Sequence, residues 1–307
     1  MHHQNNTLAP ITIFSYKRLD NLKRLIESLL LNSLASQSNL IIYSDGPKNE
    51  GDRLQVEASR EYVQNLKGFC SVRLISRDVN LGLSKSIISG VGEVLMDYDK
   101  IIVLEDDLVV APYFLKFMND ALVKYIDNDN VISIHGYVYP VKNIMPEIFF
   151  LRGADCWGWG TWRRAWDLFN AAGEKLLNNL TQTNQLKEFN FNNSFNYGGM
   201  LKDQIEGKND SWAILWYASA FLSNKLTLYP GQSLISNAGN NGFGTHKNDS
   251  KLFDVKLNMT AVSLQDIPIV HSKFAAEAFE AYFRRINGNW LSKSKKYAKR
   301  IFGVFNG

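Results

Sequence analysis

The sequence predicts an α/β fold with a mostly parallel central sheet flanked by helices. Short apolar runs alternate with longer segments whose apolar residues recur at helical spacing, and most of the runs end at a polar turn. Strands that alternate with helices in this way pair in parallel through right-handed crossovers. In such sheets, ligands collect at the carboxyl ends of the strands.

The elements of residues 1–135 can be taken in chain order. The first helix begins near Asp20 and places its apolar residues on one face. Turn signals at 44–47 and 77–82 end the second and third strands. The expected strands are 10–15, 40–43, 71–75, 100–104 and 131–135, and the later helices are expected at 53–66, 84–96 and 113–125.

Length and composition are those of an ordinary globular protein, with 307 residues of which 45% are hydrophobic. Cys70 and Cys156 have neither disulfide-framework nor metal-ligand spacing, which indicates a reducing compartment or indifference to redox, and we expect both to be small buried hydrophobic side chains. We find no secretory signal and no run of about 18 apolar residues, the length that spans a bilayer. The expected location is therefore cytoplasmic.

Positive charge is concentrated at the C-terminus. The net charge is +4, and residues 281–307 carry seven basic residues and no acid. Apolar residues between Trp290 and Phe305 predict a basic amphipathic helix that lies on an anionic membrane surface, which would make the protein peripheral at the inner face of the membrane. The alternative is a solvated basic terminus. Because no basic stripe recurs elsewhere, nucleic acid is not an expected partner.

Three consecutive acids, Glu105, Asp106 and Asp107, follow the apolar strand that ends at Leu104. Adjacent carboxylates raise one another's pKa, so a positive partner is expected beside them. Mn²⁺ or Mg²⁺ would suit them, because these cations prefer carboxylate oxygens and are commonly shared with nucleotide phosphates. A nearby lysine or arginine, or a solvated turn before the next helix, are the alternatives.

The segment 150–170 holds four of the seven tryptophans in a glycine-rich setting, and the segment 191–246 is rich in asparagine, glycine and aromatic residues. Aromatic faces beside small and amide side chains suit sugar rings, so a sugar-binding surface is expected here. Tryptophan clusters are also core material, which is the alternative.

The apolar strand followed by EDDL and VAPYF resembles the short acidic motif of GT-A glycosyltransferases, especially bacterial family 2 sugar transferases related to N-acetylglucosaminyltransferase I. The resemblance implies a Rossmann-like GT-A fold. It makes Asp107 the metal ligand, Asp106 a contact to the sugar nucleotide and Glu105 a supporting acid.

The same resemblance implies roles at other strand ends. Lys17 or Arg18 would meet the nucleotide, and Asp45 would pair with the edge of the base. Asn80 to Gly82 resembles the turn before the next helix in these enzymes, and Lys85 lies near the place of an arginine that often follows. His246, in a glycine-rich loop, would complete the metal shell or meet the diphosphate; a surface-loop histidine is the alternative.

Segments 156–162 and 209–217 resemble acceptor-side segments of such transferases. An inverting transfer needs a carboxylate that removes the proton of the attacking acceptor hydroxyl. Asp210, shortly before Trp212, is the expected general base, with Asp155 and Asp203 as rivals.

The expected protein is thus an inverting, metal-dependent glycosyltransferase. It would move a sugar from a nucleotide diphosphate donor, a UDP-sugar by preference, to a glycan or lipid-linked glycan acceptor, as in cell-surface polysaccharide or lipopolysaccharide synthesis. The expected domains are a catalytic unit, 1–250, with a nucleotide-sugar half (1–112) and an acceptor half (113–250), and a C-terminal extension, 251–307. The alternatives are a nucleotidyltransferase, disfavoured because FSYKRLD lacks glycine, and a non-catalytic sugar-binding protein.

Overall fold

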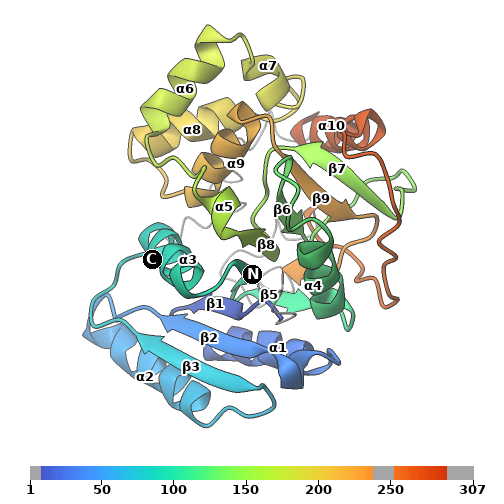
Figure 1. Cartoon of the computed structure of the whole chain (residues 1–307). Helices are drawn as coiled ribbons and strands as arrows, with labels where there is room; N and C mark the ends of the chain where they lie inside the picture. Colours follow the sequence, from blue (N-terminus) through green and yellow to red (C-terminus); the bar gives the residue numbers. More distant parts are fainter. Residues whose placement is uncertain (1–7, 238–251, 289–307) are drawn as a thin grey trace, which may run out of the picture.

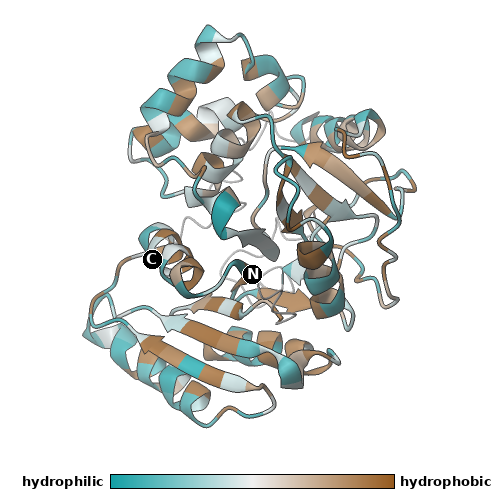
Figure 2. Ribbon diagram, viewed as in Figure 1, coloured by the Kyte–Doolittle hydropathy of each residue, from teal (hydrophilic) through white to brown (hydrophobic). Residues whose placement is uncertain are grey.

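The computed structural model describes residues 8–237 and 252–288. Its centre is an eight-stranded sheet with the order β3-β2-β1-β4-β8-β6-β9-β7. A separate antiparallel pair joins β5 (Leu108–Val110) to β10 (Ile235–Asn237). Figure 2 shows that the central strands are largely hydrophobic, whereas most helices are hydrophilic on one side and hydrophobic on the other. The core therefore lies between the sheet and the helices that cover it.

The N-terminal half is the predicted parallel unit. Its strands β1 to β4 pair in parallel, β1 with both β2 and β4, and β2 with β3. Helices α1 and α2 pack together on one face and α3 lies on the other, as right-handed crossovers require (Figure 1). The bounds are β1 Ile11–Ser15, α1 Leu19–Leu30, the short 3₁₀ helix η1 Ala35–Gln37, β2 Asn39–Ser44, α2 Glu50–Gln64, β3 Ser71–Ser76, α3 Leu83–Asp97 and β4 Lys100–Glu105.

In the second half the sheet becomes mixed. Strand β8 (Trp159–Trp162) runs antiparallel to both of its neighbours, β4 and β6 (Val131–His135). Strand β9 (Leu226–Pro230) is parallel to β6, and β7 (Ile148–Arg152) is the antiparallel edge strand. The sequence predicted β6 but not the other three strands.

The helices of this half fall into two groups. Helix α4 (Phe114–Lys124) packs on β6 and β8. The other five lie between β8 and β9 in the chain, and α6 to α9 pack on one another above the sheet (Figure 1). Their bounds are α5 Arg163–Trp166, α6 Gly173–Gln182, α7 Leu186–Phe189, α8 Tyr197–Ile205 and α9 Trp212–Leu222.

The prediction that the tryptophans form a sugar-binding surface is wrong for most of them. Trp159, Trp162, Trp212 and Trp216 are fully buried. The rings of Trp159 and Trp212 stack with their centroids 5.4 Å apart, joining β8 to α9. These side chains hold the helical layer onto the sheet, because large aromatic surfaces contribute most when they are removed from water.

The segment 252–288 is integrated into the fold. Helix α10 (Lys273–Gly288) packs on β7 and buries Phe279, Tyr282 and Phe283. The first residues of the basic tail, 281–288, therefore belong to a packed helix, and the amphipathic helix expected from Trp290 onward lies outside the described residues. Among the helices of the described ranges, none is long and apolar enough to cross a membrane.

The two cysteines behave differently from each other. Cys156 is buried, as expected, but Cys70 is exposed beside the edge strand β3, so that expectation is wrong. An edge strand has no neighbour on its outer side, and the residue before it stays in contact with water.

Candidate active site

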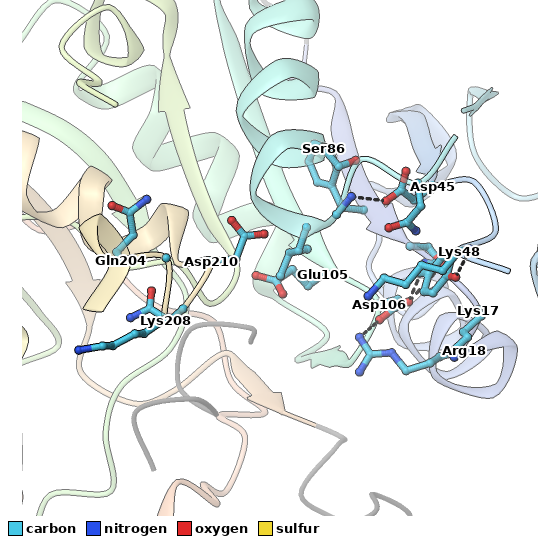
Figure 3. A pocket seen from close by; sticks show the side chains of 18 residues that line it. Lys17, Arg18, Asp45, Lys48, Ser86, Glu105, Asp106, Gln204, Lys208 and Asp210 are labelled. Atoms are coloured by element: carbon cyan, nitrogen blue, oxygen red, sulfur yellow. Dashed lines mark hydrogen bonds and ion pairs between the residues drawn. The ribbon is translucent and has the colours of Figure 1, made fainter. Parts of the chain in front are cut away.

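A cavity of about 450 Å³ opens at the carboxyl ends of β1, β2 and β4 (Figure 3). On one side it is walled by the segments that follow these strands and by the start of α3. The facing wall comes from the end of α8 and the loop before α9. The lining residues are Phe14, Ser15, Tyr16, Lys17, Arg18, Asp45, Lys48, Asn80, Gly82, Leu83, Ser86, Glu105, Asp106, Gln204, Gly207, Lys208, Asn209 and Asp210.

An arginine neutralises the acidic turn after β4. The Arg18 guanidinium donates to Asp106 and, over 3.3 Å, to Oδ2 of Asp107. Asp106 is 1% exposed and also accepts hydrogen bonds from the Ser15 hydroxyl and the backbone N–H of Tyr16. The sequence predicted a positive partner for these acids, either a metal ion or a nearby lysine or arginine. The structure places Arg18, in the loop after β1, beside them.

The acids and the arginine perturb each other's pKa values. Removal from water, and next the charge of Asp107, raises the pKa of Glu105 to about 8. Burial also raises the pKa of Asp106, although Arg18 opposes this rise. Burial by itself would lower the pKa of Arg18, but the charges of Asp106 and Asp107 outweigh it and raise that pKa. The turn thus favours a cation beside it.

Asp45 organises the loops that follow β2 and β3. Its carboxylate oxygens accept from the backbone N–H groups of Gly46, Leu81 and Gly82, at 3.1, 2.9 and 2.9 Å. The side-chain amide of Asn80 donates back to the carbonyl of Gly46 over 2.8 Å. Because these bonds join two separate loops, they fix the carboxylate of Asp45 at the wall of the cavity.

A second network fixes the loop before α2. The Tyr16 hydroxyl donates to Asp52 over 2.7 Å and accepts from the backbone N–H of Lys48 over 2.8 Å. The ammonium of Lys17 also donates to Asp52, over 2.8 Å. Asn49 caps α2 by accepting from the backbone N–H of Asp52. Lys17 therefore lines the cavity while its charge is already paired.

Asp210 stands on the facing wall. It precedes the N-cap of α9, Ser211, is exposed, and has no hydrogen-bond or ion-pair partner among the described residues. A Cβ placed on Gly82 would lie 3.6 Å from Oδ2 of Asp210, so this carboxylate reaches across to the N-terminus of α3. Figure 3 shows Glu105 between Asp210 on one side and the group of Asp45, Asp106 and Arg18 on the other.

The structure brings most of the predicted residues together. Eight of them line the cavity: Lys17, Arg18, Asp45, Asn80, Gly82, Glu105, Asp106 and Asp210. Lys85 is exposed on α3 and is not among the residues that line the cavity, whereas Ser86, one position on, lines it. Asp107 is largely buried against Arg18, outside the set that lines the cavity. His246 lies outside the described residues.

The rival acids lie elsewhere. Asp155 accepts from the backbone N–H of Cys156 and the Tyr139 hydroxyl, and Asp203 lies 4.0 Å from the ammonium of Lys208. Neither is among the residues that line the cavity.

The sequence predicted no role for several residues that line the cavity: Tyr16, Lys48, Ser86, Gln204, Gly207, Lys208 and Asn209. The positions of Tyr16 and Lys48 just after strands were the available signal. Nothing in the spacing of Gln204 to Asn209 shows that they face the strand ends, because that placement depends on how α8 packs.

The acids fit a metal ion that is shared with a ligand. Over residues 8–237 and 252–288, no group of three or more His, Cys, Asp and Glu side chains is arranged to hold a metal ion. Asp106 and Asp107 offer carboxylate oxygens, which suit Mn²⁺ or Mg²⁺, but both also contact Arg18. The residues therefore fit a cation that takes its remaining ligands from phosphates and water, and they do not form a closed protein cage.

A large, mostly parallel central sheet flanked by helices fits the GT-A fold. The chain matches the sequence model of glycosyl transferase family 2 over residues 11–201, more than half of its length, and belongs to that family. It is a glycosyltransferase, which confirms the predicted fold and enzyme class and sets aside the nucleotidyltransferase and sugar-binding alternatives.

Two solved structures are similar in part. A mannosyltransferase, PcManGT from Pyrobaculum calidifontis, in complex with GDP-Man and Mn²⁺, is 13% identical with a TM-score of 0.30, and the match covers 44% of this chain and 37% of that one. TarS 1-349 from S. aureus, in complex with UDP, is 15% identical with a TM-score of 0.32, and the match covers 47% of this chain and 42% of that one. No curated protein sequence matches the chain.

Proposed function

We propose that this glycosyltransferase is an inverting, metal-dependent enzyme that transfers a sugar from a nucleotide diphosphate sugar to a glycan or lipid-linked glycan acceptor. The observation that carries the proposal is the two-sided cavity. Asp45, Arg18 and Asp106 form one side, Glu105 lies at the middle, and Asp210 faces them from the start of α9. A donor with a nucleoside at one end and a reactive sugar at the other would place one end on each side of this cavity.

On the donor side, the chain would hold the nucleotide through fixed groups. Asp45 offers a carboxylate to the base, and Asp106 offers one to the ribose. The guanidinium of Arg18 and the ammonium of Lys17 lie on the same side and favour the negative diphosphate. Asp107 would be the protein's ligand to Mn²⁺ or Mg²⁺. When bound, such an ion would neutralise the charge that develops on the leaving diphosphate.

On the acceptor side, Asp210 would act as the general base. It would take the proton of the acceptor hydroxyl while that oxygen forms a bond to the anomeric carbon. The bond between the anomeric carbon and the diphosphate oxygen breaks on the opposite face, and its electron pair leaves with the diphosphate. One displacement inverts the configuration at the anomeric carbon. Because Asp210 has no partner among the described residues, its oxygens are available for this task.

Two measurements test the proposal. The first is a thermal-shift panel of nucleotide sugars with and without Mn²⁺, in which the true donor raises the melting temperature by mass action even with no acceptor present. Asp107→Ala is expected to remove the Mn²⁺-dependent part of that rise. If no nucleotide sugar stabilises the wild-type protein with or without Mn²⁺, the proposal is wrong.

The second measurement separates binding from chemistry. Asp210→Asn should keep donor binding but lower the rate of transfer by about a hundredfold or more, the usual contribution of a general base. Asp203→Asn is the matched control, because Asp203 lies outside the cavity on the preceding helix. Equal losses from the two substitutions would remove Asp210 from this role.

The basic segment that follows α10 also bears on how the enzyme would reach a lipid-linked acceptor. Residues 289–307 carry five lysine and arginine residues and no acid. We propose that this segment draws the enzyme to an anionic membrane surface, where lipid-linked glycans are found. Sedimentation with vesicles that contain an anionic lipid should show binding that weakens with salt and disappears when 289–307 are deleted. Undiminished binding by the shortened chain would contradict this part.

A further inference from the structure

The loop between β6 and β7, residues 136–147, presents an apolar side chain to water. Among the described residues, Ile144 is the most exposed large hydrophobic side chain, at 94%, and Lys142 is exposed two positions earlier. A single exposed apolar residue is common on protein surfaces. What distinguishes Ile144 is its place in the fold, at the same edge of the sheet as the cavity and next to the start of the basic C-terminal segment.

The register of the sheet places this loop at the cavity edge, the edge at which β1, β2 and β4 end. Val103 of β4 and His135 of β6 both pair with Trp159 of β8, so β4 and β6 run in the same direction and end at the same edge. The loop returns to the sheet at Ile148, which pairs with Pro230, the last residue of β9. Because β9 is parallel to β6, both ends of the loop lie at the cavity edge.

Helix α10 brings the C-terminal segment to the same edge. The Arg285 guanidinium donates to the carbonyl of Pro140 over 3.2 Å, and the rings of Tyr139 and Phe283 lie with their centroids 5.0 Å apart. Helix α10 ends three residues after Arg285, so the segment 289–307, with its five basic residues and no acid, begins beside this loop.

A second exposed apolar side chain lies at the cavity edge. Met259 is 59% exposed. The residue before it, Asn258, donates its backbone N–H to the carbonyl of Ser233 over 2.8 Å. The Ser233 hydroxyl in turn accepts from the backbone N–H of Val138, in the first part of the loop, over 3.2 Å. These bonds hold the segment that carries Met259 against the base of the loop.

A lipid bilayer fits these features better than a protein partner does. A stable protein interface buries about 1,200–2,000 Å², whereas this edge offers apolar side chains on two separate segments. An anionic membrane needs only a few apolar side chains that enter the headgroup region and basic residues that meet the phosphates. Lys142 and Lys256 are exposed here, but so are Asp254 and Glu147. The attraction to anionic lipid therefore comes mainly from the five bases after α10.

We infer that the cavity edge is the membrane-facing side of the enzyme, and that Ile144 enters the outer part of an anionic bilayer while the segment after α10 binds the headgroups. The inference rests on the proposed function, because it takes the acceptor to be linked to a lipid. It goes further by naming the surface that docks and the orientation that results. The mouth of the cavity is turned toward the headgroups, where the glycan of a lipid-linked acceptor begins.

The first test is sedimentation of the full chain with vesicles of phosphatidylcholine and phosphatidylglycerol. Ile144→Ser should weaken binding about tenfold, because an isoleucine side chain is no longer removed from water. The salt dependence should be the same as for wild type, since no charge has changed. Leu31→Ser is the matched control. Leu31 is 71% exposed and lies at the end of α1, before β2 begins, and so at the opposite edge of the sheet. This variant should bind like wild type, and equal binding by all three proteins would overturn the inference.

The second test reports where the loop lies. In a Cys70→Ser background, which removes the exposed thiol, Ile144→Cys is labelled with an environment-sensitive dye; Cys156 is buried. Lipids that carry a quencher in their acyl chains should quench this dye and should leave a dye at Leu31→Cys unaffected. An unquenched dye at position 144 would refute insertion. A signal that changes with protein concentration in the absence of vesicles would mean that a second copy covers the loop, and this would also overturn the inference.

Both tests use neither nucleotide nor glycan, so they are independent of the test of the proposed function. If Ile144→Ser leaves vesicle binding unchanged while a nucleotide sugar still stabilises the protein, the membrane orientation is wrong and the proposed function stands. If the loop inserts but no nucleotide sugar binds, the proposed function fails instead. Loss of vesicle binding only on deletion of 289–307 would leave the attraction with that segment and remove the role of Ile144.

Discussion

The ion pair between Arg18 and Asp106 gives the sharpest prediction about stability. Arg18→Met keeps most of the aliphatic stem of the side chain and removes its charge. The carboxylate of Asp106, with a side chain 2% exposed, is then left with its bonds to Ser15 and to the backbone N–H of Tyr16. A buried charge that loses its partner is the costly case, because its hydration is not restored.

The size of the effect follows from burial. Removing one partner of a fully buried pair costs roughly 3–5 kcal/mol. The side chain of Arg18 is 30% exposed, so water already screens part of the attraction. The two remaining donors also satisfy Asp106 in part, which lowers the estimate to about 2–3 kcal/mol in the free energy of unfolding. Arg53→Met is the matched control, because Arg53 and Glu50 are both exposed and pairs of this kind contribute under about 1 kcal/mol.

The cost should also depend on pH. Without Arg18, the pKa of Asp106 rises further above its value in the unfolded chain, because the opposing charge is gone. The folded variant then takes up a proton as the pH falls, and this uptake stabilises it. The deficit relative to wild type should be largest at alkaline pH and shrink as the pH falls through the raised pKa.

Urea unfolding of wild type, Arg18→Met and Arg53→Met across a pH series measures both effects. If the two variants lose the same small amount of stability, and the loss does not change with pH, the pair contributes little. The account of Arg18 as the cation that neutralises this turn would then be wrong.

Three further predictions concern the loops and the core. Gly46→Ala should push apart the loops after β2 and β3, because the added Cβ would lie 2.5 Å from the backbone of Val79. Urea unfolding should show that the free energy of unfolding falls by about 1–3 kcal/mol. An unchanged unfolding midpoint would contradict this geometry. Asn49→Ala removes the cap of α2 and should cost about 1 kcal/mol, whereas Asn49→Asp, which also caps, should cost little in the same assay. His135 is 0% exposed, and burial lowers its pKa in the folded protein. Its contribution to the free energy of unfolding should be constant above about pH 6.5, the ordinary pKa of histidine, and should fall as the pH drops from there through the lowered pKa of the folded state. The difference in unfolding free energy between wild type and His135→Gln should therefore decrease below that pH, and a difference that does not change with pH would refute this.

The sequence anticipated which residues meet at the carboxyl ends of β1, β2 and β4, because this placement depends on neighbouring residues alone. A buried parallel strand is an apolar run, and the residue after the run lies at the carboxyl edge whatever the rest of the chain does. Arg18, Asp45 and Asp106 each follow such a run, so their meeting at one cavity follows from the order of the strands.

The same rule could not place the rest of the site. Lys85 and Ser86 are neighbours on α3, and only the direction in which that helix faces the cavity decides that Ser86 lines it. The loop before α9 reaches the strand ends because α8 and α9 pack over the sheet through buried tryptophans. Spacing along the chain contains no information about that contact.

The amino-acid sequence by itself therefore determined the α/β class, the parallel N-terminal unit and the acids at its edge, because hydrophobic periodicity is a property of neighbouring residues. The tertiary structure decided what neutralises those acids and which carboxylate faces them. Arg18 reaches Asp106 across 88 positions in the chain, and Asp210 approaches Gly82 from the other half of the fold. Such distances depend on how whole helices and strands pack, because packing alone fixes the separation of residues far apart in the chain.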